Sequence, residues 1–276
     1  MKILDAHQHF WRYKPEQDSW ITAEMSVLRR DYLPADLAPE LKRNGVSACI
    51  SVQAAQSECE TEFLLEQAAA NDFVAGVVGW ADLCAPDIEQ KLAGWADRDQ
   101  LCGFRHIVQG ESDVNFLLRK DFQRGIDTLT LRGLTYDILV FPHQLGAVLE
   151  FVRRHPEQPF VIDHLAKPYI ADGFIDGWEV LMRAIGECEN VYCKISGMVT
   201  EAQWENWRYG DFEPYLGVVL ESFGPKRLMF GSDWPVCRLA ATYEEVLRIA
   251  KDFAAQLGPD EQKDFFYRNA ATFYGI

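Results

Sequence analysis

Two histidines near the amino end of the chain, His7 and His9, have a spacing that suits chemistry. The apolar run 3–6 in front of them predicts a β-strand, and alternate residues of a strand point to the same face. Both imidazoles would therefore project into one space. There they could bind a metal ion or stabilise a developing oxyanion. A His-x-His pair without partners would be ordinary, so its meaning depends on the rest of the chain.

Polar residues also end the other strands that the sequence predicts. They are Gln53, Trp80, Arg105, His106, Tyr136, Asp137, Asp163, His164, Lys194 and Asp233. In a parallel barrel the carboxyl ends of all strands meet at one face, so these side chains would share one site. We predict that His7, His9, His164 and Asp233 are catalytic. Asp233 would be the general base for a water molecule, and the histidines would stabilise the oxyanion with help from Arg105.

The elements that position these residues are eight short apolar runs, each followed by a more polar segment. The runs cover 3–6, 47–52, 74–80, 102–107, 134–140, 160–162, 191–195 and 228–231. Continuous apolar character is typical of parallel strands that are buried on both faces. Between them we predict helices, including 34–44, 58–71, 141–155, 179–189 and 244–255. The sequence thus predicts an α/β fold, a single (β/α)8 TIM barrel domain over residues 1–276.

Two further segments, 11–33 and 200–213, are polar and rich in aromatic residues. The first is too long for an ordinary connection, so we predict that it covers the mouth of the barrel. The second is expected to be another cover. Trp11, Trp20, Trp80 and Trp234 could form an aromatic wall against a sugar ring, although tryptophan also fills barrel mouths without a function.

Composition restricts the partners and the compartment. The formal net charge is −15, which argues against nucleic acid and anionic membranes as partners. Seven cysteines, an odd number without Cys-x-x-Cys spacing, predict a reduced, cytoplasmic protein. No apolar run approaches the roughly 20 residues that span a bilayer, and we expect no signal peptide ahead of the His-x-His pair. A homo-oligomer stays an open alternative.

Three longer motifs accompany the His-x-His pair: 103–109 (GFRHIVQ), 163–168 (DHLAKP) and 230–235 (FGSDWP). Together, and in this order, they resemble the amidohydrolase superfamily and its lactone-hydrolysing branch. That branch contains hydrolases of L-fucono- and L-rhamnonolactone and of 2-pyrone-4,6-dicarboxylate. The resemblance covers essentially the whole chain. It implies an amidohydrolase-like barrel and a hydrolase of carbohydrate metabolism that acts on a carboxylic ester bond.

The chain departs from the two-metal members of this superfamily. Its fourth predicted strand offers Arg105 and His106, and its fifth offers Tyr136 and Asp137, so we expect no binuclear site. One divalent ion, zinc before others, could be held by His7, His9, His164 and Asp233. The alternative is that no metal is required, because the lactonase branch includes metal-independent members. From the missing strand-five ligand we expect a bound ion to be dispensable.

We predict that substrate is bound by Arg105, Tyr136, Gln53, Trp80, Lys194, Trp11 and Trp234. Arg105 rather than His106 should face the barrel interior, since strand neighbours point to opposite sides. A core position for Tyr136 and a buried ion pair for Lys194 are competing interpretations, and Lys167 is expected to serve only its loop.

Few cations are available at the mouth, which favours a neutral substrate. We therefore expect a small sugar lactone of the L-fucono- or L-rhamnono- type, opened to its aldonic acid. A dicarboxylate (pyrone-type) lactonase and a metal-dependent decarboxylase of the same superfamily are the alternatives. A barrel without catalysis is disfavoured, because a decayed site should have lost one of the residues His7, His9, His164 and Asp233.

Overall fold

A computed structural model describes residues 1–16 and 18–276; residue 17, within the predicted cover 11–33, lies outside the described residues. Eight parallel strands pair in chain order from β1 to β8. They are β1 (Leu4–Gln8), β2 (Ala48–Val52), β3 (Val74–Gly79), β4 (Leu101–His106), β5 (Thr135–Ile138), β6 (Phe160–Ile162), β7 (Val191–Ile195) and β8 (Leu228–Phe230). Every predicted strand is present, and the predicted (β/α)8 barrel is confirmed.

The barrel closes through the segment that follows β8. The backbone N–H of Asp233 donates to the carbonyl of His7 at 2.8 Å, and the N–H of His9 donates to the carbonyl of Trp234 at 2.7 Å. The Asp5 carboxylate also accepts the N–H of Ser232 at 2.8 Å. Residues separated by more than 220 positions are therefore joined at the edge where the polar residues lie.

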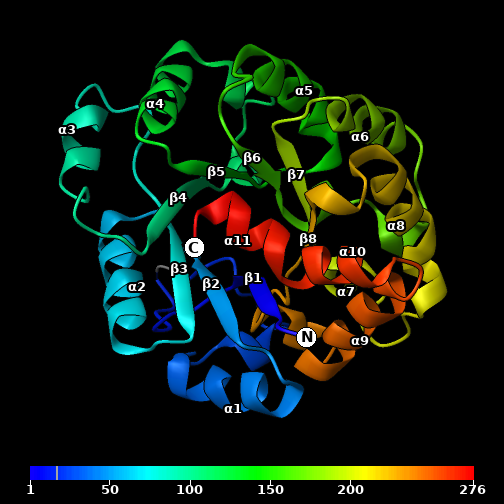
Figure 1. Cartoon of the computed structure of the whole chain (residues 1–276). Coiled ribbons are helices and arrows are strands. Elements are labelled where there is room, and N and C mark those ends of the chain that lie inside the picture. The colour runs from blue at the N-terminus through cyan, green and yellow to red at the C-terminus, as the bar shows by residue number, and fades with distance from the viewer. Residues whose placement is uncertain (17) are drawn as a thin grey trace.

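Helices lie around these strands and across one end of the barrel (Figure 1). They are α1 (Pro34–Asn44), α2 (Glu58–Ala70), α3 (Ile88–Ala93), α4 (Lys120–Leu131), α5 (Leu145–Arg154), α6 (Trp178–Gly186), α7 (Met198–Glu201), α8 (Tyr209–Phe223), α9 (Tyr243–Ala254), α10 (Pro259–Lys263) and α11 (Asn269–Tyr274). Helix α1 begins at a proline and ends at Gly45, whose φ of 68° is the left-handed conformation that glycine favours. The helix predicted over 141–155 starts as a short 3₁₀ turn, Pro142–Gln144, ahead of α5.

Helix α11 closes the amino end of the barrel and crosses the centre of the view in Figure 1. Its Ala270, Phe273 and Tyr274 pack with interior side chains of the strands, such as Leu4 and Met229. Burial of this apolar cluster favours the closed floor, at about 25 cal/mol per Å² of apolar surface removed from water. Polar residues are thereby left to the opposite, carboxyl end.

The two predicted covers are both next to that carboxyl end, but they differ in structure. In the first, Trp11 and Tyr32 pair as an antiparallel bridge, with N–H to carbonyl distances of 2.9 and 3.0 Å. The second, residues 200–213, includes the end of α7 and the start of α8, where the buried Phe212 and Tyr215 anchor α8 on the barrel. Within the described part of the chain, no helix is both long and apolar enough to span a membrane.

Candidate active site

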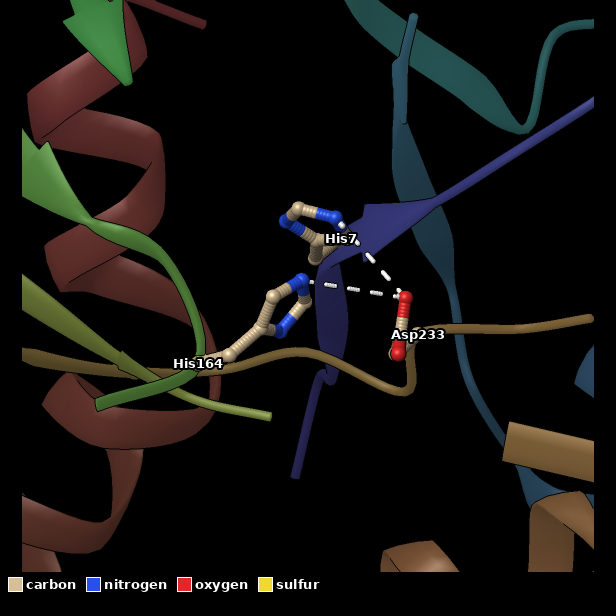
Figure 2. A group of neighbouring side chains, drawn as sticks. All are labelled: His7, His164 and Asp233. Atoms are coloured by element: carbon tan, nitrogen blue, oxygen red, sulfur yellow. Dashed lines mark ion pairs between the residues drawn. The ribbon is translucent and has the colours of Figure 1, made fainter. Parts of the chain in front are cut away.

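Four predicted residues meet at the carboxyl ends of β1, β6 and β8. The Oδ1 atom of Asp233 lies 3.4 Å from Nε2 of His9 and 3.9 Å from Nε2 of both His7 and His164. Figure 2 shows a ring nitrogen of His7 and one of His164 directed at the same carboxylate oxygen of Asp233. All four side chains are at most 5 % exposed. The barrel therefore gathers three imidazoles and one carboxylate in a space almost free of bulk water.

The other ring nitrogen of each histidine has a fixed partner. His9 Nδ1 lies 2.7 Å from the carbonyl oxygen of Val52, which can only accept, so Nδ1 carries the hydrogen and Nε2 presents a lone pair. His164 Nδ1 lies 2.8 Å from the Ser196 hydroxyl. His7 Nδ1 lies 3.2 Å from Oδ1 of Asp163. These partners orient all three rings with Nε2 toward Asp233.

A network of buried charges lies beneath the histidines. Asp163 pairs with Arg105 at 2.9 Å through Oδ2 and with Lys194 at 2.9 Å through Oδ1. Lys194 also pairs with Asp137 at 2.5 Å, and the Tyr274 hydroxyl of α11 donates to that carboxylate at 2.9 Å. Each charge is compensated inside the barrel, as burial requires. The network ties the floor helix to the ring of His7.

Burial and these neighbours shift the pKa values of the site. Desolvation lowers the pKa of His164 to about 4 and holds that of His7 well below its usual value. Burial acts to raise the pKa of Asp233, but His164 and His9 outweigh it and the net shift is downward. At neutral pH, His7 and His164 are therefore neutral and Asp233 is ionised. This combination provides nitrogen lone pairs and a proton acceptor in one place.

The backbone that carries His164 and Asp233 is strained. His164, Leu165, Ala166 and Lys167 have φ values between 50° and 56°, and Asp233 has a φ of 57°. A left-handed conformation costs each such residue about 1–2 kcal/mol. The turn 164–167 is held by two bonds at 2.7 Å, from the N–H of Lys167 to the carbonyl of His164 and from the Trp178 indole to the carbonyl of Leu165. Strain that is held this firmly concentrates at functional sites.

A cavity of about 200 Å³ opens above the four residues. Its walls include the predicted residues His9, Arg105, His164 and Asp233, together with Trp20, Ala54, Ile107, Gln109, Leu139, Lys167 and Val236. Gln109 and Lys167 were not among the predicted site residues. Both belong to motifs that resemble the lactonase branch, 103–109 and 163–168. Membership of these motifs could have predicted them as site residues.

Arg105 lies inside the barrel and His106 faces the helices. Two of the predicted substrate residues, Tyr136 and Trp80, do not line the cavity. Tyr136 is fully buried among aromatic rings of the helix layer, because its neighbour Asp137 takes the interior face of β5. The Trp80 indole donates instead to His106 Nδ1 at 3.3 Å.

Four more predicted substrate residues support the site without lining the cavity. The side-chain amide of Gln53 donates to the backbone carbonyl of Arg105 at 3.1 Å. The backbone carbonyl of Gln53 in turn accepts from the Arg105 guanidinium. Lys194 is fully buried in its ion pairs, which agrees with the competing interpretation. Trp11 and Trp234 both pack edge-on against the ring of Tyr32, at centroid distances of 5.4 and 5.2 Å. These residues do not line the cavity, and their role in binding substrate stays a prediction.

The donor set fits a single divalent cation. Ligand atoms of His7, His164 and Asp233 all lie within 4.8 Å of one another. His7 Nε2 and His9 Nε2 are 3.2 Å apart, and the lone pair of His9 Nε2 points into the same space. Imidazole nitrogen and carboxylate oxygen are preferred ligands of zinc and similar ions, and ring orientation by a second partner is typical of such ligands. The structure thus contains a possible metal site.

Gly197 allows His164 to take its position. A Cβ atom on Gly197 would lie 2.5 Å from Nδ1 of His164, and its φ of 64° is unfavourable for any other residue. We expect Gly197→Ala to displace the ring and to lower kcat by about 10²-fold, since small misplacements of reacting groups have effects of this size. Steady-state kinetics on the purified variant measures it.

Gly217→Ala is the matched control, because Gly217 lies within α8 and a Cβ there meets no atom within 4 Å. It should keep full activity and gain slightly in stability, since alanine favours helix over glycine. Equal activity of the Gly197 variant and this control would contradict the assigned position of His164.

Known proteins resemble this chain over its whole length. The family model described as amidohydrolase matches residues 4–276. An L-fucono-1,5-lactonase of Burkholderia multivorans is 42% identical over 284 residues, covering 99% of this chain and 96% of the relative. An L-fucono-1,5-lactonase of Burkholderia ambifaria is 38% identical over 280 residues, covering 99% and 95%. A crystal structure of a Burkholderia multivorans amidohydrolase with bound zinc is 42% identical, with a TM-score of 0.96 over 100% of both chains. The chain belongs to the amidohydrolase family.

Proposed function

We propose that this protein hydrolyses a sugar-acid lactone of the L-fucono-1,5-lactone type to the aldonic acid. The observation that carries the proposal is the convergence of three imidazole nitrogens on the ionised Asp233, which lines the cavity together with His9 and His164. The names of the two relatives that are 42% and 38% identical support the same substrate class. We further propose that residues 1–276 act as one domain in the cytoplasm, where its cysteines, all free in the described chain, stay reduced.

The reaction adds water across the ring ester. Asp233 accepts a proton from the water as its oxygen bonds to the carbonyl carbon, and negative charge develops on the carbonyl oxygen. The ring C–O bond then breaks, and the leaving oxygen takes the proton that Asp233 received. The carboxylic acid so formed ionises at neutral pH. One proton is therefore released for every lactone opened, which makes the reaction visible to a pH indicator.

His9 acts in this scheme as a ligand rather than as a hydrogen-bond donor. Because His9 Nδ1 donates to the carbonyl of Val52, His9 Nε2 has a lone pair and no hydrogen to offer an oxyanion. We propose that His7, His9, His164 and Asp233 hold one divalent cation, with zinc the first candidate because of the zinc-bound relative. Such an ion would polarise the carbonyl and acidify water.

Removing the metal tests this part of the proposal. The expectation that a bound ion is dispensable is replaced here, because His9 has no hydrogen to donate to an oxyanion. A chelator should abolish turnover, and added zinc should restore it while elemental analysis finds about one ion per chain. Full turnover by protein that retains less than about a tenth of an ion per chain would instead support the metal-independent alternative.

The charges of the cavity favour a neutral substrate. Among the described residues that line it, the two permanent cations are Arg105 and Lys167. The Arg105 guanidinium is engaged by Asp163, His7 and Gln53, so of these two cations Lys167, which also pairs with Glu201, is the one with donors left for an incoming anion. Two substrate carboxylates would each require a cation with free donors. A polyol lactone requires only hydrogen bonds.

A comparison of substrates decides between the two lactonase classes. The pH-indicator assay would measure kcat/KM for L-fucono-1,5-lactone, L-rhamnono-γ-lactone and 2-pyrone-4,6-dicarboxylate, after subtraction of the spontaneous hydrolysis. We expect a sugar lactone to be preferred. A preference for the pyrone by about tenfold, equal to about 1.4 kcal/mol in the transition state, would overturn the proposal in favour of a dicarboxylate lactonase.

A further inference from the structure

The left-handed turn 164–167 projects a second side chain into the cavity besides His164. Lys167 ends this turn, and both residues line the cavity. The turn is rigid, because Leu165 and Ala166 are fully buried and Trp178 holds the carbonyl of Leu165 at 2.7 Å. A strained but rigid turn fixes the direction of the side chains at both of its ends. The position of Lys167 is thus built into the fold and is not that of a free surface lysine.

The ammonium group of Lys167 has donors to spare. It pairs with Glu201 Oε1 at 3.1 Å and lies 5.6 Å from the centre of the Phe141 ring. An ammonium group carries three N–H donors, and the structure gives one a partner. By contrast, the two terminal nitrogens of Arg105 donate to Asp163, His7 and Gln53, and its remaining donor, Nε–H, has no partner but is buried. Of the two permanent cations that line the cavity among the described residues, Lys167 is the one that can still bind an incoming oxygen.

Glu201 determines where this ammonium group stays. Glu201 ends α7, in the segment between β7 and α8, and its side chain is 20% exposed, like the 19% of Lys167. The pair thus joins the turn after β6 to the neighbouring cover at the rim of the cavity. An ion pair as accessible as this contributes little to stability. Its main effect is therefore the position that it gives to the charge.

The proposed reaction turns a neutral molecule into an anion. A cation at the position of Lys167 interacts more strongly with the anion than with the neutral lactone. The ground-state lactone has no charge, whereas the transition state carries an oxyanion and the product a carboxylate. A fixed positive charge stabilises the transition state and the product more than the substrate. We propose that Lys167 is a catalytic residue that binds the negative charge developed during ring opening, and that Glu201 is its positioning residue; this rests on the proposed lactonase function.

Two variants test the proposal, with product binding as a readout independent of turnover. Lys167→Met keeps the length of the side chain and removes the charge. We expect kcat to fall by about tenfold or more, KM for the neutral lactone to change by less than about threefold, and the inhibition constant of the aldonate product to rise by about tenfold or more. Lys167→Arg should restore much of the product binding, because it restores the charge.

Glu201→Gln separates a contact role from a structural one. If the ammonium group binds the anion, this variant keeps the charge, and its affinity for the aldonate should equal or exceed that of the wild type. If only the ion pair matters, Glu201→Gln and Lys167→Met should behave alike, and the proposal would be overturned. Lys263→Met is the control for the loss of a lysine charge, since Lys263 pairs with Asp260, is more exposed than Lys167 and does not line the cavity.

The failure of this proposal is distinct from the failure of the proposed function. Unchanged kcat and unchanged product inhibition in Lys167→Met, with an active wild type, would remove Lys167 from the site and leave the lactonase function intact. A wild type that opens none of the lactones would overturn the function itself. Calorimetric titration of L-fuconate into wild type and Lys167→Met then also shows whether the anion is bound at all, and equal affinities would exclude the role of Lys167.

Discussion

Replacement of Asp233 by asparagine should lower kcat by roughly 10²–10⁴-fold, the usual effect of losing a positioned general base. The amide has the size of the carboxylate but cannot accept the proton of water. Folding should be retained, because asparagine tolerates the left-handed backbone that Asp233 adopts at a φ of 57°. The pH-indicator assay measures the turnover, and circular dichroism checks the fold.

The zinc content of the Asp233→Asn variant must be measured as well, because Asp233 is also a candidate ligand. A variant that keeps its metal but loses turnover points to the base, whereas a variant without metal requires assay at saturating zinc. Asp176→Asn is the control, since Asp176 is an exposed loop residue. Turnover within about threefold of the wild type would remove Asp233 from the role of base.

Asp163→Asn is expected to have the largest effect on stability. The fully buried carboxylate of Asp163 compensates Arg105 and Lys194, and it orients His7. An asparagine of the same size would leave two buried cations with a single carboxylate partner, Asp137. Breaking a buried ion pair from one side costs about 3–5 kcal/mol. Urea unfolding at pH 7 measures this loss of the free energy of unfolding.

The effect of Asp163→Asn should depend on pH. Burial acts to raise the pKa of Asp163, but Lys194, His7 and Arg105 outweigh it and hold the pKa well below its usual value. Because the folded-state pKa is lower than the unfolded value of about 3.9, ionised Asp163 favours folding above that value. The contribution is lost as the pH falls through the folded-state pKa.

The difference between wild type and Asp163→Asn should therefore be full at pH 7 and become smaller in acid. Asp260→Asn, which removes an exposed pair with Lys263, should leave the free energy of unfolding unchanged within error. If Asp163→Asn unfolded at the same urea concentration as the wild type at pH 7, the assignment of this network as the support of His7 would be wrong.

The sequence by itself determined the barrel and the residues that meet at its carboxyl end. Buried parallel strands appear in the sequence as continuous apolar runs. A polar residue that ends such a run lies at the carboxyl end of the barrel, outside the apolar core. This is why the strands and the convergence of His7, His9, His164 and Asp233 could be predicted from residue types and order alone.

Only the tertiary structure decided which of two neighbouring side chains on a strand faces the barrel interior. Alternation along a strand tells that Tyr136 and Asp137 point apart, but not which one points inward. Asp137 does so because Lys194 and Tyr274, distant in the chain, compensate its charge there. The same holds for Lys167: four non-glycine residues in a left-handed turn cannot be predicted from local preference, which disfavours that conformation. Burial and contacts across the barrel supply the free energy that holds it, and these exist only in the folded chain.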